Sequence, residues 1–197
     1  QTDDPALVDD PTELEAATMT VELSDVGFEA NESTDLMQEI GSFTGSGLAG
    51  RSAAERTRLV REAGGTEGSE QAVKRALLWI ARHQSPDGGW NFHHLGGRCA
   101  CKGHGSMAEA RIGATALALL PYLGAGNTHL SGNYKEVVAK GLYFLKNSQK
   151  GNGSLHEPGG RMYSHGLAAI VLCEAYAMTG DKNLLPNAQA SLNFISY

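Results

Sequence analysis

The chain has 197 residues, of which 41% are hydrophobic and 19% are charged, and its formal net charge is −6. No run approaches the roughly 18 consecutive apolar residues that a membrane-spanning helix needs, so we expect no membrane span. The basic side chains are dispersed rather than gathered in one cluster, which argues against nucleic acid as a partner.

The acidic residues are concentrated at the N-terminus. Residues 1–50 hold 12 of the 22 Asp and Glu residues and no Lys or Arg, whereas residues 51–197 hold 16 basic and 10 acidic ones, so −12 and +6 give −6. An acidic block without helical periodicity predicts an irregular extension or linker, although Met19–Leu23 alternates as a short strand would. We therefore expect an acidic extension (1–50) followed by a helical domain (51–197).

Helices are expected throughout the second part of the chain, because apolar residues recur there at helical spacing. Ser52 with Glu55, and Ser106 with Glu109, have the spacing of capping boxes, and Gly180 is a typical helix stop. Two helices are apolar nearly all round and should lie inside, while two keep a polar face and should lie outside. The expected inner helices are 107–124 and 162–179, the outer ones are 69–83 and 134–148, and further helices are expected at about 52–63 and 188–195.

One segment, residues 74–90, returns at 139–155 with a constant offset of 65. In this alignment Trp79 corresponds to Phe144, Gln84 to Gln149, Gly88 to Gly153, and Trp90 to Leu155. A third copy begins at 188–195, 50 residues after the second, but the chain ends before its Gln and Gly. Repeats of this size indicate stacked supersecondary units. We expect a fragment of a longer polypeptide, or half of an assembly.

These segments resemble the QW repeat of squalene–hopene cyclases, in the prenyltransferase/squalene-oxidase repeat family. The first copy matches in Gln84 and in Gly88-Gly89-Trp90, while the second has Leu155 in place of Trp. The resemblance extends from about position 69 to the end of the chain. It implies an all-α fold, namely an α/α toroid or partial (α/α) barrel of repeated helical hairpins. It does not by itself imply an activity, because only some members of the family are enzymes.

The motif also has a physical rationale. A helix leaves its last carbonyls unpaired, and a following Gly permits the left-handed turn that satisfies them. A Gln side chain can tie such a turn to the backbone of another helix, and a Trp can cover the junction with a large apolar face. We therefore interpret the motif residues as structural staples rather than ligand contacts; they are Trp79, Gln84, Asp87, Gly88, Gly89, Trp90, Phe144, Gln149 and Gly153.

The loop after Trp90 is rich in potential metal ligands. Tetrahedral zinc sites use Cys and His, commonly with two to four residues between a Cys pair, and the Cys-x-Cys pair here is tighter than that. A disulfide between cysteines two positions apart would be strained, and a polar loop with reduced thiols is the third alternative. The candidate zinc ligands are His93, Cys99, Cys101 and His104.

Catalytic residues are harder to identify. The resemblance to cyclases implies an Asp-rich motif that protonates an alkene, but between 51 and 197 Asp occurs only at positions 87 and 181. The zinc-binding Asp, Cys and His of prenyltransferases cannot be placed either. The polar residues that begin the inner helices could also have purely structural roles. An acid there can act as a helix cap, and a His is more often a hydrogen-bonded core residue. The candidates for the mouth of a central cavity are Glu109, Arg111, Arg161, Tyr163 and His165.

Two functions remain after these observations. The first is a non-catalytic α/α-repeat domain that offers a concave surface to a protein or to an apolar, isoprenoid ligand. The alternative is the N-terminal half of a terpenoid (squalene) cyclase-like or prenyltransferase-like enzyme whose catalytic acid lies outside this chain. Neither a phosphate-binding Gly-rich loop nor a Gly-x-Ser-x-Gly elbow is present. No cofactor is predicted apart from the possible zinc ion, and the residues indicate no cellular compartment.

Overall fold

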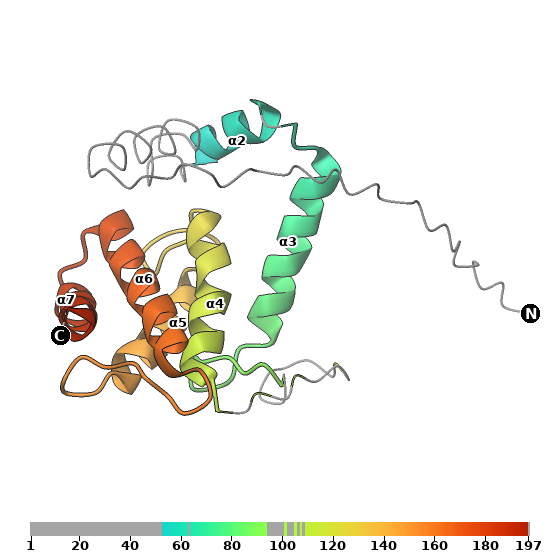
Figure 1. The fold of residues 1–197 in the computed structure, drawn as a ribbon. Helices are drawn as coiled ribbons and strands as arrows, with labels where there is room; N and C mark the ends of the chain where they lie inside the picture. Colours follow the sequence, from blue (N-terminus) through green and yellow to red (C-terminus); the bar gives the residue numbers. More distant parts are fainter. Residues whose placement is uncertain are drawn as a thin grey trace, which may run out of the picture. The chain divides into compact units, whose positions relative to one another are not determined.

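The structure is a computed structural model that describes residues 53–62, 64–93, 101, 105, 107 and 109–196. The acidic extension predicted over 1–50, and Ser52 of the first expected capping box, lie outside these residues. The helices are numbered as in Figure 1, and the described part of the chain contains no strand. They are α2 (Ala53–Glu62), α3 (Glu67–Arg82), α4 (Arg111–Gly124), α5 (Lys135–Ser148), α6 (Arg161–Thr179) and α7 (Leu185–Ile195).

Helix α3 begins two residues earlier than its periodicity predicts, because a capping box precedes it. The Thr66 hydroxyl accepts from the Ser69 amide at 3.2 Å, and the Ser69 hydroxyl accepts from the Thr66 amide at 3.0 Å. These reciprocal bonds satisfy amides that a helix start otherwise leaves unpaired. The pattern was missed in the sequence because Ser, rather than Glu or Gln, occupies the third helical position.

Helix α4 begins at Arg111, which is later than the expected capping box at Ser106 and Glu109 requires. Ala110 occupies the N-cap position and offers no side-chain bond to the helix. Pro121 lies inside this helix without ending it, and α4 continues to Gly124. Helix α6 ends as predicted at Gly180, whose φ of 65° is the left-handed conformation that glycine adopts most readily.

The helices form an all-α arrangement of inner and outer members. Helices α4 and α6 pack along each other, α5 and α3 pack against α4, and α7 packs against α6. Figure 1 shows α4 and α6 side by side, with α7 beyond α6. The predicted assignment of the two most apolar helices to the inside is therefore confirmed. No described helix combines the length and apolarity that crossing a bilayer requires.

The core lies where the inner helices meet each other and their outer neighbours. Fully buried leucines and valines from three helices fill it, which is the apolar burial that stabilises stacked helical hairpins. One polar group is satisfied within it, because the Tyr122 hydroxyl donates to the Leu77 carbonyl at 2.7 Å. The fully buried side chains of this core include Leu119, Leu123, Leu145, Val138, Val171 and Leu172.

Candidate functional site: two repeat corners and the inner-helix face

The first repeat corner, residues 84–90, is tied by the side chain of Gln84. Its Nε2 donates to the carbonyls of Gly88 and Val137, both at 2.9 Å. The first bond closes the turn, and the second joins it to α5. The glutamine therefore links one outer helix to the next outer helix, rather than to the inner helix that follows in sequence.

The second repeat corner, residues 149–155, has equivalent bonds: the bond within the turn has the same four-residue spacing, and the second bond again reaches another helix. Gln149 Nε2 donates to the carbonyls of Gly153 and Asn187, both at 3.0 Å. Asn187 lies in α7, so this corner joins α5 to α7. The Asn187 side-chain amide also donates to Gln149 Oε1 at 2.6 Å, which gives the second corner a bond that the first lacks.

Trp90 ends the first corner and is 4% exposed. Its indole nitrogen donates to the Ile80 carbonyl at 2.7 Å, near the end of α3. Its backbone amide donates to Thr115 Oγ1 at 3.0 Å, which fixes the corner to the inner helix α4. A buried Trp with its N–H satisfied covers the polar junction from solvent, as an amphipathic aromatic does well.

His165 takes the role of Thr115 in the second corner, although the sequence analysis placed it at a cavity mouth. The Leu155 amide donates to His165 Nδ1 at 2.9 Å, and His165 Nε2 lies 3.1 Å from the Ser191 carbonyl of α7. The side chain is fully buried. Burial lowers the pKa of the His165 imidazole below its ordinary value of 6.5. Thr115 and His165 are equivalent because each accepts from the backbone amide of the last corner residue, Trp90 or Leu155, although their chemistry differs.

Asp87 and Arg111 form a bidentate ion pair across the first corner. Both Arg111 terminal nitrogens lie 2.8 Å from the Asp87 carboxylate oxygens, and the guanidinium stacks 4.8 Å from the centre of the Phe144 ring. Hydrogen bonding to Arg111 lowers the pKa of the Asp87 carboxyl. A Cβ at Gly89 would lie 2.9 Å from side-chain atoms of Arg111 and Phe144, so one of these side chains would have to shift to admit it. Arg111 is therefore engaged in the corner rather than presented to a ligand.

The remaining motif residues differ in exposure. Trp79 is 44% exposed and stacks on His83 with ring centroids 3.9 Å apart. Gly88 and Gly153 have φ values of 92° and 85°. A Cβ at Gly88 would overlap the Lys140 carbonyl of α5. Both corners therefore bring a left-handed glycine against the backbone of the next outer helix.

Glu157 is a residue that the sequence analysis missed. Its two carboxylate oxygens accept from the amides of Ile112 and Gly113, each at 2.8 Å, and Oε1 also accepts from Ser164 Oγ at 2.5 Å. Glu157 is 9% exposed. It thus supplies, from 45 residues away, the anionic cap that α4 lacks locally, where the helix dipole favours negative charge.

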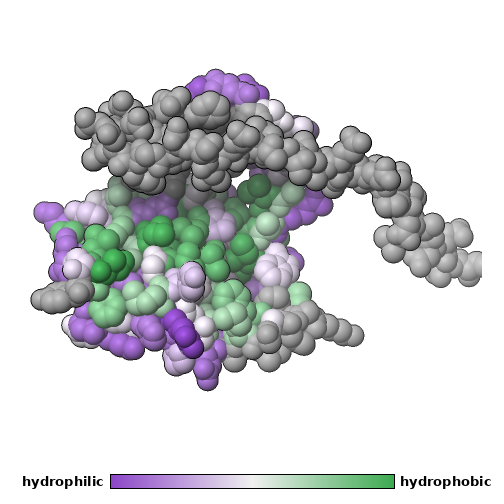
Figure 2. Space-filling model, viewed as in Figure 1, coloured by the Kyte–Doolittle hydropathy of each residue, from purple (hydrophilic) through white to green (hydrophobic). Residues whose placement is uncertain are grey.

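The inner-helix face consists of the exposed apolar side chains of α4 and α6. Leu117 on α4 is 44% exposed, and Ile170 and Tyr163 on α6 are 54% and 84% exposed. Figure 2 shows hydrophobic side chains gathered over α4 and α6. The other cavity-mouth candidates, Glu109 and Arg161, are exposed, and Arg161 has a φ of 50° at the start of α6. Exposed apolar patches of this kind are typical of interaction surfaces in soluble proteins.

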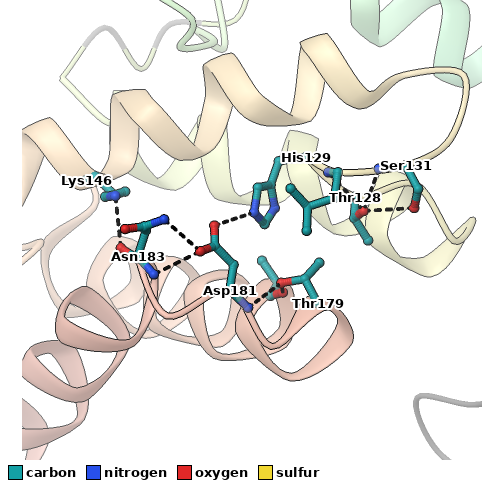
Figure 3. Close-up of polar contacts among 9 residues, drawn as sticks. Thr128, His129, Ser131, Lys146, Thr179, Asp181 and Asn183 are labelled. Carbon is teal, nitrogen blue, oxygen red and sulfur yellow. Dashed lines mark hydrogen bonds and ion pairs between the residues drawn. The ribbon is translucent and has the colours of Figure 1, made fainter.

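A polar junction joins the loops that follow the two inner helices. His129 Nε2 lies 2.9 Å from Asp181 Oδ2, and Asp181 Oδ1 accepts from the backbone and side chain of Asn183 at 2.9 Å (Figure 3). Hydrogen bonds from the Asn183 backbone amide and from His129 lower the pKa of the Asp181 carboxyl, and the Asn183 bond has the larger effect. A cleft of about 170 Å³ lies beside this pair and extends to Tyr143 and Lys146.

The zinc hypothesis receives no support from the described side chains. Cys99 and His104 lie outside the described residues, and His93 and Cys101 lie within them. Among the residues that the structure describes, no group of three or more His, Cys, Asp and Glu side chains is arranged to hold a metal ion. A zinc site that includes Cys99 and His104 stays a prediction.

The fold and the two corners define a class of protein, an α/α-repeat protein whose outer helices are joined by Gln-containing turns. Residues 58–180 match the family model described as squalene-hopene cyclase C-terminal domain. The chain belongs to this family, as the QW resemblance implied.

The comparison with curated proteins gives a relative over a shorter stretch. A probable squalene–hopene cyclase of Sinorhizobium fredii (strain NBRC 101917 / NGR234) is 32% identical over 91 residues. The match covers 46% of this chain and 13% of that protein. The chain therefore spans only a small part of its relative's length. The search of solved structures gave no significant match.

Proposed function

We propose that this chain is a non-catalytic α/α-repeat domain whose inner-helix face binds an apolar, isoprenoid-like ligand. The observation that carries the proposal is the exposure of Leu117, Tyr163 and Ile170 on the two helices that are inner in the stack. Burying a Leu or Ile side chain stabilises a complex by roughly 1.5–3 kcal/mol. A hydrocarbon chain lying across both helices would gain this energy without needing a polar partner.

The state of the two aspartates in residues 51–197 supports a non-catalytic role. Asp87 is held by Arg111 in a bidentate pair, and Asp181 is held by His129 and Asn183. Both have a lowered pKa, so both favour the ionised form. An acid that protonates an alkene needs the opposite, a proton held on a carboxyl group that reaches the ligand. Glu157, in the loop before α6, serves as a helix cap.

The test uses the full chain, a fluorescent anionic probe of apolar surfaces (1-anilinonaphthalene-8-sulfonate) and uncharged farnesol as a competitor. Leu117→Asp and Ile170→Asp should each weaken probe binding and farnesol displacement by about tenfold, since each removes an apolar contact and adds a charge. Tyr143→Asp is the matched control, because Tyr143 is 65% exposed on the outer helix α5. Equal loss in all three variants, or no loss in the first two, would reject the inner-helix face as the binding site.

A second candidate function is a part of a terpenoid cyclase-like enzyme whose catalytic acid lies elsewhere. The family match and the similarity to a probable squalene–hopene cyclase favour it. The two candidates differ in a direct measurement, in which the protein is incubated with squalene and the extract is analysed by gas chromatography. A cyclic hydrocarbon product that is absent from heat-treated controls would replace the non-catalytic assignment. Binding of farnesol without any cyclic product supports the first candidate.

A further inference from the structure

The bonds of His165 define its protonation state. The Leu155 backbone amide always carries a hydrogen, so His165 Nδ1, 2.9 Å away, must accept and is unprotonated. The Ser191 carbonyl can only accept, so His165 Nε2 at 3.1 Å donates. The imidazole is therefore neutral, with its proton on Nε2. It joins three segments at once, namely α6, the second corner and α7.

Among the residues that the structure describes, the hydrogen-bond partners of His165 are backbone groups, and no carboxylate is bonded to its ring. Its ring packs 4.8 Å from the Phe194 ring of α7. Helix α7 carries no titratable side chain. Besides His165 itself, the titratable side chains on the second corner, the following loop, α4 and α6 are Lys150, His156, Glu157, Arg111, Tyr122, Arg161, Tyr163, Cys173, Glu174 and Tyr176. The one carboxylate in the loop before α6, Glu157, is occupied by Ile112, Gly113 and Ser164. His156 opposes a charge on His165 by repulsion.

A second proton on His165 would disrupt the corner. Protonated Nδ1 would be a donor facing the donor Leu155 N–H, so the bond that closes the second corner would be lost. The new charge would lie in a fully buried position with no opposite charge beside it, which is unfavourable. In the first corner the equivalent residue, Thr115, accepts from the Trp90 amide with a hydroxyl that does not titrate. The two corners thus differ in whether acid can open them.

We propose that His165 is a pH-sensitive latch that holds α7 on α6, and that mild acid releases α7 while the α3–α4–α5 part stays folded. The direction of the pH effect follows from the lowered pKa of His165 in the folded protein. At pH values above the unfolded value of 6.5 the latch contributes its full stability. As the pH falls below 6.5, His165 binds a proton in the open form but not in the closed form, so opening becomes more favourable.

The test measures amide hydrogen exchange of the full chain between pH 5 and 8, with the intrinsic pH dependence of exchange removed. For the wild type, the opening constant reported by α7 amides, such as that of Ala188, should rise up to tenfold per pH unit below about 6.5, as one bound proton requires. Amides of α5, such as that of Val138, should change much less. His165→Thr, which copies the residue of the first corner, should remove the pH dependence from α7, while His156→Asn should keep most of it.

The outcomes that would overturn the latch are specific. The proposal fails if α7 opening in the wild type does not depend on pH, or if His165→Thr retains the wild-type dependence. If His165→Thr does not fold, His165→Asn replaces it, because the Asn side-chain oxygen can accept from Leu155. A nitrogen NMR titration of the wild type gives an independent readout. A neutral ring protonated on Nε2 that titrates below 6.5 supports the latch, whereas an Nδ1-protonated ring, or titration at or above 6.5, refutes it.

Discussion

Gly153 meets the carbonyl oxygen of Ala190 so closely that a side chain at Gly153 would overlap it. The glycine closes the second corner with a φ of 85°, and the carbonyl belongs to α7. Gly88 has the same relationship to Lys140 of α5 in the first corner. The corners therefore depend on the absence of a side chain as much as on the glutamine bonds.

Gly153→Ala should destabilise the protein far more than Gly180→Ala. Both glycines have positive φ, but a Cβ at Gly180 meets nothing within 4 Å. We expect a loss of about 1–2 kcal/mol for Gly180→Ala from the left-handed conformation alone. For Gly153→Ala we expect about 3 kcal/mol or more, because overlap with α7 adds to it. Urea unfolding followed by circular dichroism measures both, and equal losses would contradict the proposed close approach.

Removal of a corner glutamine should cost more than removal of an exposed one. Gln84→Ala and Gln149→Ala each delete two side-chain bonds to backbone carbonyls. We expect each to lower the free energy of unfolding by about 1–2 kcal/mol. Gln189→Ala is the control, since the Gln189 side-chain amide donates to the Asn193 side chain on the exposed surface of α7. This variant should stay within about 0.5 kcal/mol of the wild type. If all three variants lowered the free energy of unfolding by the same amount, the corner bonds would contribute no more to stability than an exposed side-chain bond does.

Glu157→Ala should destabilise the protein more than substitutions in loops usually do. It leaves the Ile112 and Gly113 amides and the Ser164 hydroxyl without their acceptor, and we expect a loss of about 2–3 kcal/mol. Glu157→Gln keeps one acceptor oxygen and should fall between the Ala variant and the wild type. Glu136→Gln removes an exposed acid from the first turn of α5 and serves as the control. If thermal unfolding of Glu157→Ala matches that control, the carboxylate is not a cap for α4.

The Asp87–Arg111 pair should stabilise the protein only modestly and should do so only above acid pH. The Asp87 side chain is half exposed, so Asp87→Asn should cost less than about 1 kcal/mol at pH 7. The folded pKa of Asp87 lies below the ordinary 3.8. The pair therefore contributes fully above pH 3.8 and is lost as the pH falls through the folded pKa. Urea midpoints of the wild type and Asp87→Asn should be measured at pH 7, 4 and 2.5. The difference between the two proteins should shrink as the pH falls, and a difference that stays constant would contradict this.

The helices and the corners could be predicted because both depend on local patterns. Apolar periodicity located α4 and α6, and the 65-residue offset located Gln149 and Gly153. The Glu157 cap could not be predicted, because its partners are 44 and 45 residues away and no local pattern links them. His165 is the hydrogen-bonded core residue that the sequence analysis gave as the alternative to a place at the cavity mouth. Thr115 and His165 are 50 residues apart whereas the corners are 65 apart, so only the bonds from the Trp90 and Leu155 amides show what the two residues share.

The glutamine bonds run between outer helices, from the first corner to α5 and from the second to α7. Polar contacts to the main chain at the periphery of the stack thus help to set the step from one hairpin to the next. The exposed side chains of Leu117, Tyr163 and Ile170 on the inner-helix face take no part in these glutamine bonds. Sequence drift there could remodel what the domain recognises while the spacing of the hairpins stays the same.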